Sequence, residues 1–169
     1  MRPFTRLWMM AMLVLAFEAS SAELDAVHLS STITELRGSD SVAPKTPRWR
    51  AAELALIVQA DDFQVAPYRD NHVSLADPTW TWSVAVDGEL YARAYNGVRA
   101  GWYKSAMRER AGQISVAGMK RLVAFEPVTG TINEKIDSAY RAKYRGSRYL
   151  EAMLSERASA ATVRIKPVQ

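Results

Sequence analysis

Alternating hydrophobic and polar positions between residues 80 and 95 predict a β-hairpin. Asp87-Gly88 interrupts the alternation once, and Asp-Gly is typical of a two-residue type I′ turn. A turn at this pair fixes the register, with the expected partners Val86–Glu89, Val84–Tyr91, Trp82–Arg93 and Trp80–Tyr95. Residues opposite each other share a face of a hairpin. We therefore expect one wide aromatic face that carries a single arginine, and one face of small residues.

The rest of the chain alternates between helical and strand-like patterns without a regular βαβ order. Helices are expected over 48–59, 101–110, 132–144 and 148–157, and strands over 63–67, 114–117, 119–128 and 162–168. The fold class predicted is α+β, a small antiparallel split β-barrel of about six strands with inserted and flanking helices. In the 132–144 helix we expect a buried stripe ending in two tyrosines, at Ile132, Ile136, Tyr140 and Tyr144.

Local signals at the helix ends give three further expectations. Thr46-Pro47 is expected to begin the first helix, as N-cap and first helical residue. Thr131 and Glu134 have the spacing of a capping box. Asp137 and Arg141 are expected to form an exposed pair one helical turn apart.

The first residues have the pattern of a secretory signal peptide. Basic residues precede an apolar run over 7–17, and Ser20-Ser21-Ala22 supplies the small residues of a cleavage site. The run would span only about 16 Å as a helix, about half the hydrocarbon thickness of a bilayer. We expect a signal peptide over 1–22, a flexible linker over 23–45 and a single split-barrel-like domain over 46–169.

The signal peptide predicts a periplasmic or secreted protein that meets the membrane only transiently, through that peptide. Two alternatives stay open: an uncleaved anchor, and a misassigned gene start that would leave the protein cytoplasmic.

Composition removes several classes of function. The chain has 22 Lys and Arg against 18 Asp and Glu, for a net charge of +4, and this near balance argues against a nucleic-acid partner. It has no cysteine, which excludes disulfides, thiolate catalysis and cysteine-ligated zinc. With only His28 and His72, no metal site is expected. Asp61-Asp62 is interpreted as a solvated helix end, and no set of residues identifies a catalytic group.

Several motifs together resemble an uncharacterised bacterial family, domain of unknown function (DUF) 2255. The most specific is Ile-Asp-x-Ala-Tyr-Arg-x-Lys-Tyr at 136–144. The others are Trp49 with Glu53-Leu54, and the segments 60–63, 86–93, 101–103, 125–128 and 161–165. The resemblance covers about residues 47–168, while the leader and residues 67–78 depart from it. Because the family has no assigned activity, the resemblance implies a fold and no chemistry.

The segment from the hairpin onward is more faintly similar to split-barrel flavin and deazaflavin oxidoreductases. The features that carry the similarity are the hairpin, the loop with Gly97 after it, and Trp102-Tyr103. The similarity implies a cofactor-binding site, for flavin mononucleotide or a deazaflavin, at Arg93, Tyr95, Asn96, Gly97, Arg99, Trp102, Tyr103 and Lys104. Ala100-Gly101 and Lys104-Ser105 depart from the residues usual in those enzymes. In the competing interpretation Trp-Tyr belongs to the core, Arg93 stacks on Trp82, and Arg99 is solvated.

The function predicted is an exported module that binds a small molecule or a partner without catalysis of its own. The alternative is a flavin- or deazaflavin-dependent oxidoreductase that uses the loop after the Asp87-Gly88 hairpin to hold the cofactor phosphate. A homodimer is expected only from the similarity to split-barrel proteins.

Overall fold

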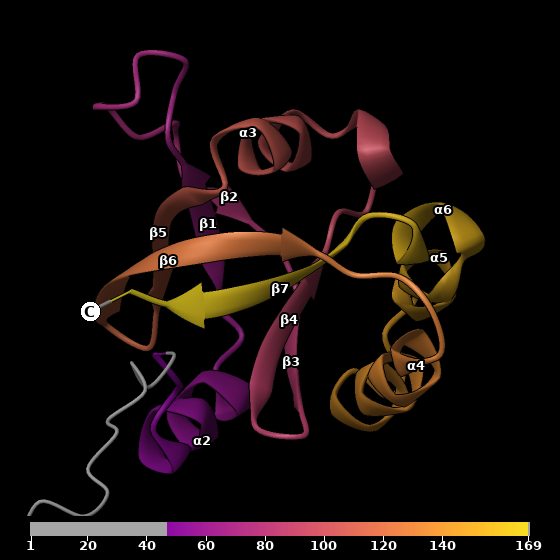
Figure 1. Cartoon of the computed structure of the whole chain (residues 1–169). Helices are drawn as coiled ribbons and strands as arrows, with labels where there is room; N and C mark the ends of the chain where they lie inside the picture. Colours follow the sequence, from indigo (N-terminus) through magenta and orange to yellow (C-terminus); the bar gives the residue numbers. More distant parts are fainter. Residues whose placement is uncertain (1–46, 169) are drawn as a thin grey trace, which may run out of the picture. The chain divides into compact units, whose positions relative to one another are not determined.

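The computed structural model describes residues 47–168, which fold around one antiparallel sheet (Figure 1). Its seven strands run in the order β2-β1-β5-β6-β7-β4-β3. The strands are β1 Gln64–Pro67, β2 Thr79–Trp80, β3 Ser83–Val86, β4 Glu89–Arg93, β5 Ala111–Val116, β6 Met119–Pro127 and β7 Thr162–Pro167. The helices are α2 Ala51–Gln59, α3 Gly101–Glu109, α4 Ile132–Lys143, α5 Leu150–Leu154 and α6 Glu156–Ser159, with a 3-10 turn η1 Gly97–Arg99. The predicted α+β split-barrel class is confirmed, with β2 as a short additional strand. The predicted signal peptide and linker lie outside the described residues.

The sheet is curled because its two edge strands are neighbours in the chain. β2 ends at Trp80 and β3 begins at Ser83, so two residues carry the chain from one edge of the sheet to the other. Thr81 holds this junction: its N–H donates to Phe63 O at 3.0 Å, and its hydroxyl donates to Arg93 O at 2.8 Å. These bonds link the start of β1 to the end of β4, the two strands next to the sheet edges, where no ladder joins them.

The predicted hairpin is confirmed, but its ladder is shorter than expected. Asp87 and Gly88 have φ of 51° and 79°, as a type I′ turn requires, and Val86 lies opposite Glu89. The pairing ends at Ser83 opposite Ala92. The expected pairs Trp82–Arg93 and Trp80–Tyr95 were wrong, because the chain leaves β3 at Trp82 and Trp80 pairs with Gln64 of β1.

Two hydrophobic cores lie on opposite faces of the curled sheet. The concave face encloses buried residues from β1, β4, β5, β6, β7, α2 and α3 and from the segments just before α2 and β1. They are Trp49, Leu54, Ile57, Phe63, Val65, Leu90, Ala92, Ala106, Ile114, Val116, Val123, Phe125, Val163 and Ile165. The second core lies between the hairpin and α4, and contains Trp82, Val84, Val86, Tyr91, Ile136, Tyr140 and Met153. The part of the wide aromatic face that carries Trp82, Val84 and Tyr91 is therefore buried beneath α4, while Trp80 and Tyr95 stay exposed. The small-residue face points into the barrel.

The helix ends differ from the sequence-based expectation for local reasons. α2 begins at Ala51, because the buried Trp49 donates its indole N–H to Ile165 O at 2.8 Å and Arg50 stays extended. Thr131 has φ −63° and ψ −19°, already helical, so its side chain forms no cap and the predicted capping box is absent. Ser155, with ψ 153°, divides the expected 148–157 helix into α5 and α6.

Candidate functional site

Arg93, the one arginine on the aromatic face of the hairpin, is completely buried. Its guanidinium donates to Asp137 Oδ1 at 2.6 Å and to Asn133 Oδ1 at 2.9 Å, both from α4. It also donates to Thr162 Oγ1 at 2.9 Å and to Met153 O at 3.1 Å. Four of its five N–H groups are bonded and the side chain is completely buried, so Arg93 joins β4 to β7, α4 and α5 and is inaccessible to a ligand.

Two predictions about this region were wrong. The guanidinium of Arg93 lies over the ring of Tyr140, 5.3 Å from its centroid, and not over Trp82. The Trp82 ring instead stacks on Tyr144 at 3.9 Å and 7°. Asp137 pairs with Arg93 rather than with Arg141, because α4 turns that carboxylate toward the sheet. The prediction that Tyr140 and Ile136 belong to the core is confirmed.

Next to this buried arginine lies an aromatic cleft of about 370 Å³. Its lining residues come from β2, the β2–β3 junction, the end of β4 and α5: Trp80, Thr81, Trp82, Tyr95, Tyr149 and Met153. Trp80, Tyr95 and Tyr149 are 56%, 42% and 45% exposed, and no other aromatic side chain in residues 47–168 is as accessible. The exposed aromatic rings thus converge on one hollow.

A second lobe of about 320 Å³ continues the cleft toward α3. Both lobes are lined by Trp80, Thr81 and Tyr95, and the second adds Thr79, Asn96, Ala100, Gly101 and Trp102. The first backbone N–H of α3 with a helical acceptor is that of Lys104, which donates to Ala100 O at 3.1 Å. The three N–H groups before it have no backbone acceptor within the described part of the chain. This lobe therefore places free donors beside an aromatic wall.

The cleft walls are held by specific contacts. The Trp80 indole N–H donates to Asp61 O at 2.8 Å, which fixes the ring above the junction. The rings of Tyr95 and Tyr149 meet edge to face with centroids 6.3 Å apart. These contacts span segments far apart in the sequence, so the cleft exists only in the folded chain.

Gly97 brings α6 against the cleft. Its φ is +66°, and a Cβ built on it would lie 2.6 Å from Arg157 Cγ and 2.7 Å from Arg157 O. Only glycine permits this approach. The approach also places the guanidinium carbon of Arg157 5.8 Å from the centroid of the Tyr95 ring.

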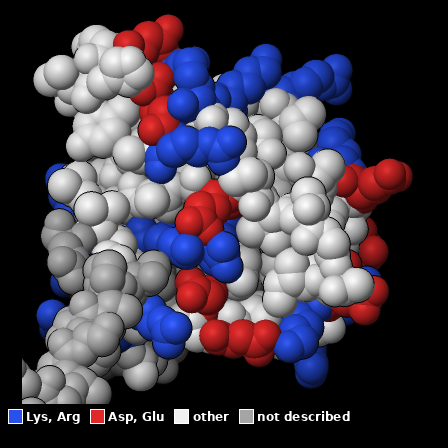
Figure 2. Space-filling view, in the orientation of Figure 1, with Lys and Arg blue, Asp and Glu red and all other residues white. Residues whose placement is uncertain are grey.

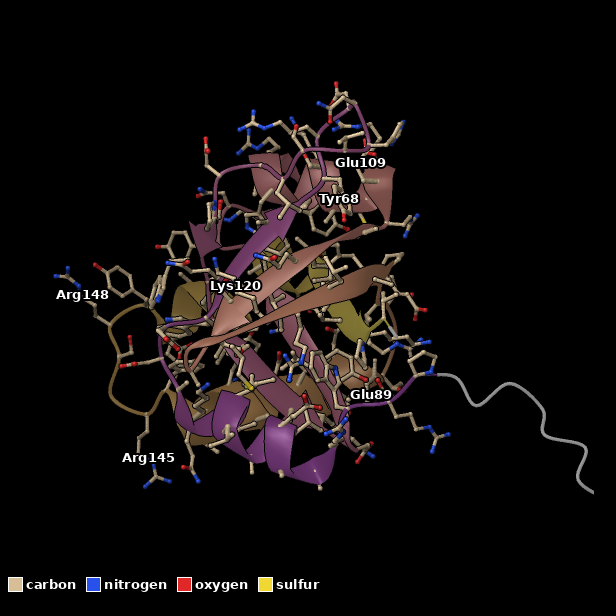
Figure 3. The ribbon with its side chains drawn as sticks, turned by 90° about the vertical axis from the view of Figure 1, so that its left-hand side faces the viewer. Tyr68, Glu89, Glu109, Lys120, Arg145 and Arg148 are labelled. Carbon is tan, nitrogen blue, oxygen red and sulfur yellow. The ribbon has the colours of Figure 1, made fainter. Side chains whose placement is uncertain are left out.

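Basic side chains lie over two of the aromatic rings that line the cleft. Arg157 lies over Tyr95, and Arg148 lies over Tyr149 with its guanidinium carbon 4.8 Å from the ring centroid. Within residues 47–168 neither arginine forms an ion pair with a carboxylate. Arg148 projects away from the sheet (Figure 3). Elsewhere the charges are mixed, since basic and acidic side chains alternate over the face shown in Figure 2.

The structure separates the eight residues of the predicted cofactor site. Tyr95, Asn96 and Trp102 line the cleft. Arg93 is buried beneath α4, Gly97 is buried against α6, and Tyr103 packs on the barrel core. Arg99 and Lys104 are exposed and do not line either lobe.

Sequence reasoning missed four residues of the first lobe, Trp80, Thr81, Tyr149 and Met153, and Thr79 of the second. The aromatic pattern of the hairpin was a signal for Trp80, but it placed that residue opposite Tyr95. No pattern in the sequence predicts that α5 packs against the hairpin.

The described residues contain no cluster of three or more metal-ligating side chains. In the same part of the chain, no helix is long and apolar enough to cross a membrane.

Comparison with known proteins identifies the family. A family model described as an uncharacterized protein conserved in bacteria (DUF2255) matches residues 53–165. No curated protein matches the chain. Among solved structures, the conserved hypothetical protein Rv2991 from Mycobacterium tuberculosis is 13% identical with a TM-score of 0.49, over 73% of this chain and 82% of that chain. A FAD-binding protein (mll6688) from Mesorhizobium loti is 16% identical with a TM-score of 0.40, over 73% and 91% of the two chains.

Proposed function

The chain belongs to the DUF2255 family of uncharacterised bacterial proteins, and we propose that it binds a flat, anionic small molecule in the aromatic cleft without catalytic groups of its own. The observation that carries the proposal is the convergence of Trp80, Tyr95 and Tyr149 on one hollow. Folded proteins bury large aromatic rings where they can, and exposed rings gathered in a concave site are typical of ligand binding.

The shape and lining of the cleft favour a planar ligand. The floor is formed by Thr81, Trp82 and Met153, and the exposed rings form the walls. Flat aromatic surfaces gain most from a partner that stacks on them or meets them edge to face. The Thr81 hydroxyl is already bonded to Arg93 O, so the first lobe offers mainly apolar contact.

The charge at the rim favours an anionic ligand. Arg148 and Arg157 each lie over a wall ring and lack a carboxylate partner among the described residues. A carboxylate or phosphate on a bound ring would complete charge-assisted hydrogen bonds with them.

The proposal can be tested by calorimetric titration of the full chain with 2-naphthoate and 2-naphthamide, which share a ring system and differ in charge. We expect the carboxylate to bind more tightly, and the difference to disappear in the Arg148→Gln/Arg157→Gln double variant. Absence of binding by either probe, together with no small molecule retained by protein purified from its native host, would contradict the proposal.

The alternative function is a flavin- or deazaflavin-dependent oxidoreductase, and the second lobe is the observation that favours it. Tyr95 and Trp102 could flank a flat ring, while Asn96 and the free N–H groups at the start of α3 could hold a phosphate. Arg93 does not fit this role, because it is completely buried and four of its five N–H groups are bonded within the protein. When bound, such a cofactor would supply hydride transfer, and the chain would bind and orient it.

This alternative is tested by titrating flavin mononucleotide and riboflavin, which differ only in the phosphate. A preference for flavin mononucleotide that is lost in a Gly101→Pro variant, which removes one free N–H at the phosphate lobe, would support it. No measurable affinity for flavin mononucleotide or a deazaflavin would contradict it while leaving the naphthoate result to decide the first proposal.

Export and dimerisation stay predictions from the sequence. Intact-mass measurement of the protein from its native host would report whether residues 1–22 have been removed. The same sample under non-denaturing conditions would report the oligomeric state.

A further inference from the structure

We propose that Lys143 is a reactive amine that condenses with the aldehyde group of small apolar molecules in a groove between α2, β3 and α4. The groove encloses about 420 Å³ and is lined by Val58, Val84, Ala85, Ala139, Ala142 and Lys143. Every lining residue except Lys143 is aliphatic. The groove shares no lining residue with the aromatic cleft, so it is a second site with its own chemistry.

The position of Lys143 is fixed by two backbone carbonyls. Its Nζ donates to Ala60 O, at the end of α2, at 2.9 Å, and to Ser83 O, on the edge strand β3, at 3.0 Å. An ammonium has three N–H groups, whereas a neutral amine has two N–H groups and a lone pair. The neutral form can therefore keep both hydrogen bonds, and loss of the third proton exposes the lone pair without breaking either contact.

The surroundings make the neutral form accessible near neutral pH. Burial lowers the pKa of Lys143 to about 8, and the carboxylate of Asp61 acts in the opposite direction. The other group facing the amine is Tyr144, whose ring centroid lies 5.1 Å from Nζ and whose pKa is raised by burial to about 12, so it stays neutral. A lysine with a lowered pKa in an apolar groove is the arrangement that favours attack on a carbonyl.

The reaction balances with no further reagent. The Nζ lone pair forms a bond to the aldehyde carbon, and the carbonyl π electrons move to oxygen, which takes one proton from the nitrogen. A second proton, from solvent, lets that oxygen leave as water while the nitrogen lone pair forms the C=N bond, which gives a protonated imine with one N–H left on the nitrogen. Ser83 O also accepts from the Tyr144 hydroxyl at 3.2 Å, so the remaining N–H can serve Ala60 O and neither carbonyl is left without a donor.

Reductive trapping tests the proposal directly. The full chain is incubated near neutral pH with butanal and sodium cyanoborohydride, and the butylation of each lysine is followed by peptide mass spectrometry. We expect Lys143 to react at least tenfold faster than the exposed Lys104 and Lys120, because each unit by which its pKa is lowered raises its free-amine fraction about tenfold. The rate at Lys143 should reach its half-maximum near pH 8.

Two variants test whether the groove, and not the general reactivity of lysine side chains, accounts for the reaction. Lys143→Arg keeps a cation and its hydrogen-bond donors but has no nucleophilic amine. Fast butylation at position 143 should therefore vanish, while Lys104 and Lys120 react as before. Ala142→Leu narrows the groove from an exposed position and should slow butylation of Lys143 severalfold without slowing its methylation by formaldehyde. Butylation of Lys143 no faster than that of Lys104 would overturn the proposal, and so would an Ala142→Leu variant that treats both aldehydes alike.

Discussion

Arg93 and Asp137 form a partly buried ion pair, 2.6 Å between Nη1 and Oδ1, that fastens α4 to the hairpin. The arginine side chain is inaccessible to solvent, while the carboxylate is 31% exposed. The pair explains why the hairpin arginine is unavailable to a ligand: its role is to hold α4 and β7 against β4.

Replacement of Arg93 by methionine should therefore destabilise the protein strongly. The change leaves Asp137 and Asn133 facing an apolar side chain, and breaking a buried pair by removing one partner costs about 3–5 kcal/mol. Urea unfolding of the full chain measures the loss. The control is Arg141→Met, at an exposed position of the same helix, which should change the unfolding free energy by less than about 0.5 kcal/mol. Equal losses in the two variants would show that the pair contributes nothing of its own.

Trp80 should matter for binding much more than for stability. Its ring is more than half exposed, so Trp80→Ala removes little buried area and one hydrogen bond, a cost of about 1 kcal/mol. Truncation of a central aromatic contact commonly costs about 2 kcal/mol in binding, so the affinity for 2-naphthoate should fall more than tenfold. Val73→Ala, exposed and outside the cleft, is the control for both measurements. An unchanged affinity in Trp80→Ala would place the ligand elsewhere.

Two glycines with positive φ make a matched pair for testing the approach of α6. Gly97→Ala adds a Cβ 2.6 Å from Arg157 Cγ, whereas a Cβ at Gly88 meets nothing within 4 Å. Both variants incur the left-handed backbone cost of about 1–2 kcal/mol, and only Gly97→Ala adds overpacking of about 1–3 kcal/mol. Thermal unfolding should therefore show a larger loss for Gly97→Ala, together with weaker 2-naphthoate binding as Arg157 moves. Equal losses of stability in the two variants would mean that α6 shifts to accommodate the added methyl group.

Local chemistry explains what could be predicted from the sequence. Asp87-Gly88 sets the hairpin register within a few residues, and the α4 stripe follows from spacing within one helix. The environment of Arg93 could not be predicted in this way, because its side-chain partners lie between 40 and 69 residues away in the chain. A pattern shows which residues share a face, but not which element will cover that face.

For the same reason, only part of the candidate site could be predicted from the sequence. Tyr95, Asn96 and Trp102 lie close together in sequence, and a resemblance of motifs was enough to select them. Tyr149 and Met153 reach the cleft only because α5 follows α4 across the hairpin, a consequence of tertiary packing. Arg99 and Lys104 were selected for their charge, yet the basic side chains that lie over the cleft rings belong to α6 and to the segment before α5.

The Glu126 carboxylate should contribute to the loss of stability in acid. Glu126 lies opposite Arg164 on β6 and β7, accepts from its guanidinium at 2.5 Å and 2.9 Å, and pairs with Lys166 at 2.9 Å. Burial alone would raise the pKa of Glu126, but the bonds from Lys166 and Arg164 outweigh it and the pKa lies below the usual 4.5. Because the folded state binds this proton less readily than the unfolded state, the contribution is complete above about pH 4.5 and is lost as the pH falls through the lowered pKa.

Urea unfolding from about pH 7 to about pH 3 should show a smaller acid-dependent loss in Glu126→Gln than in the unaltered protein. Glu151→Gln, at an exposed position of α5 without an ion pair among the described residues, should leave the profile unchanged. If the two variants and the unaltered protein lose stability in parallel, the β6–β7 ion pairs are not what acid disrupts.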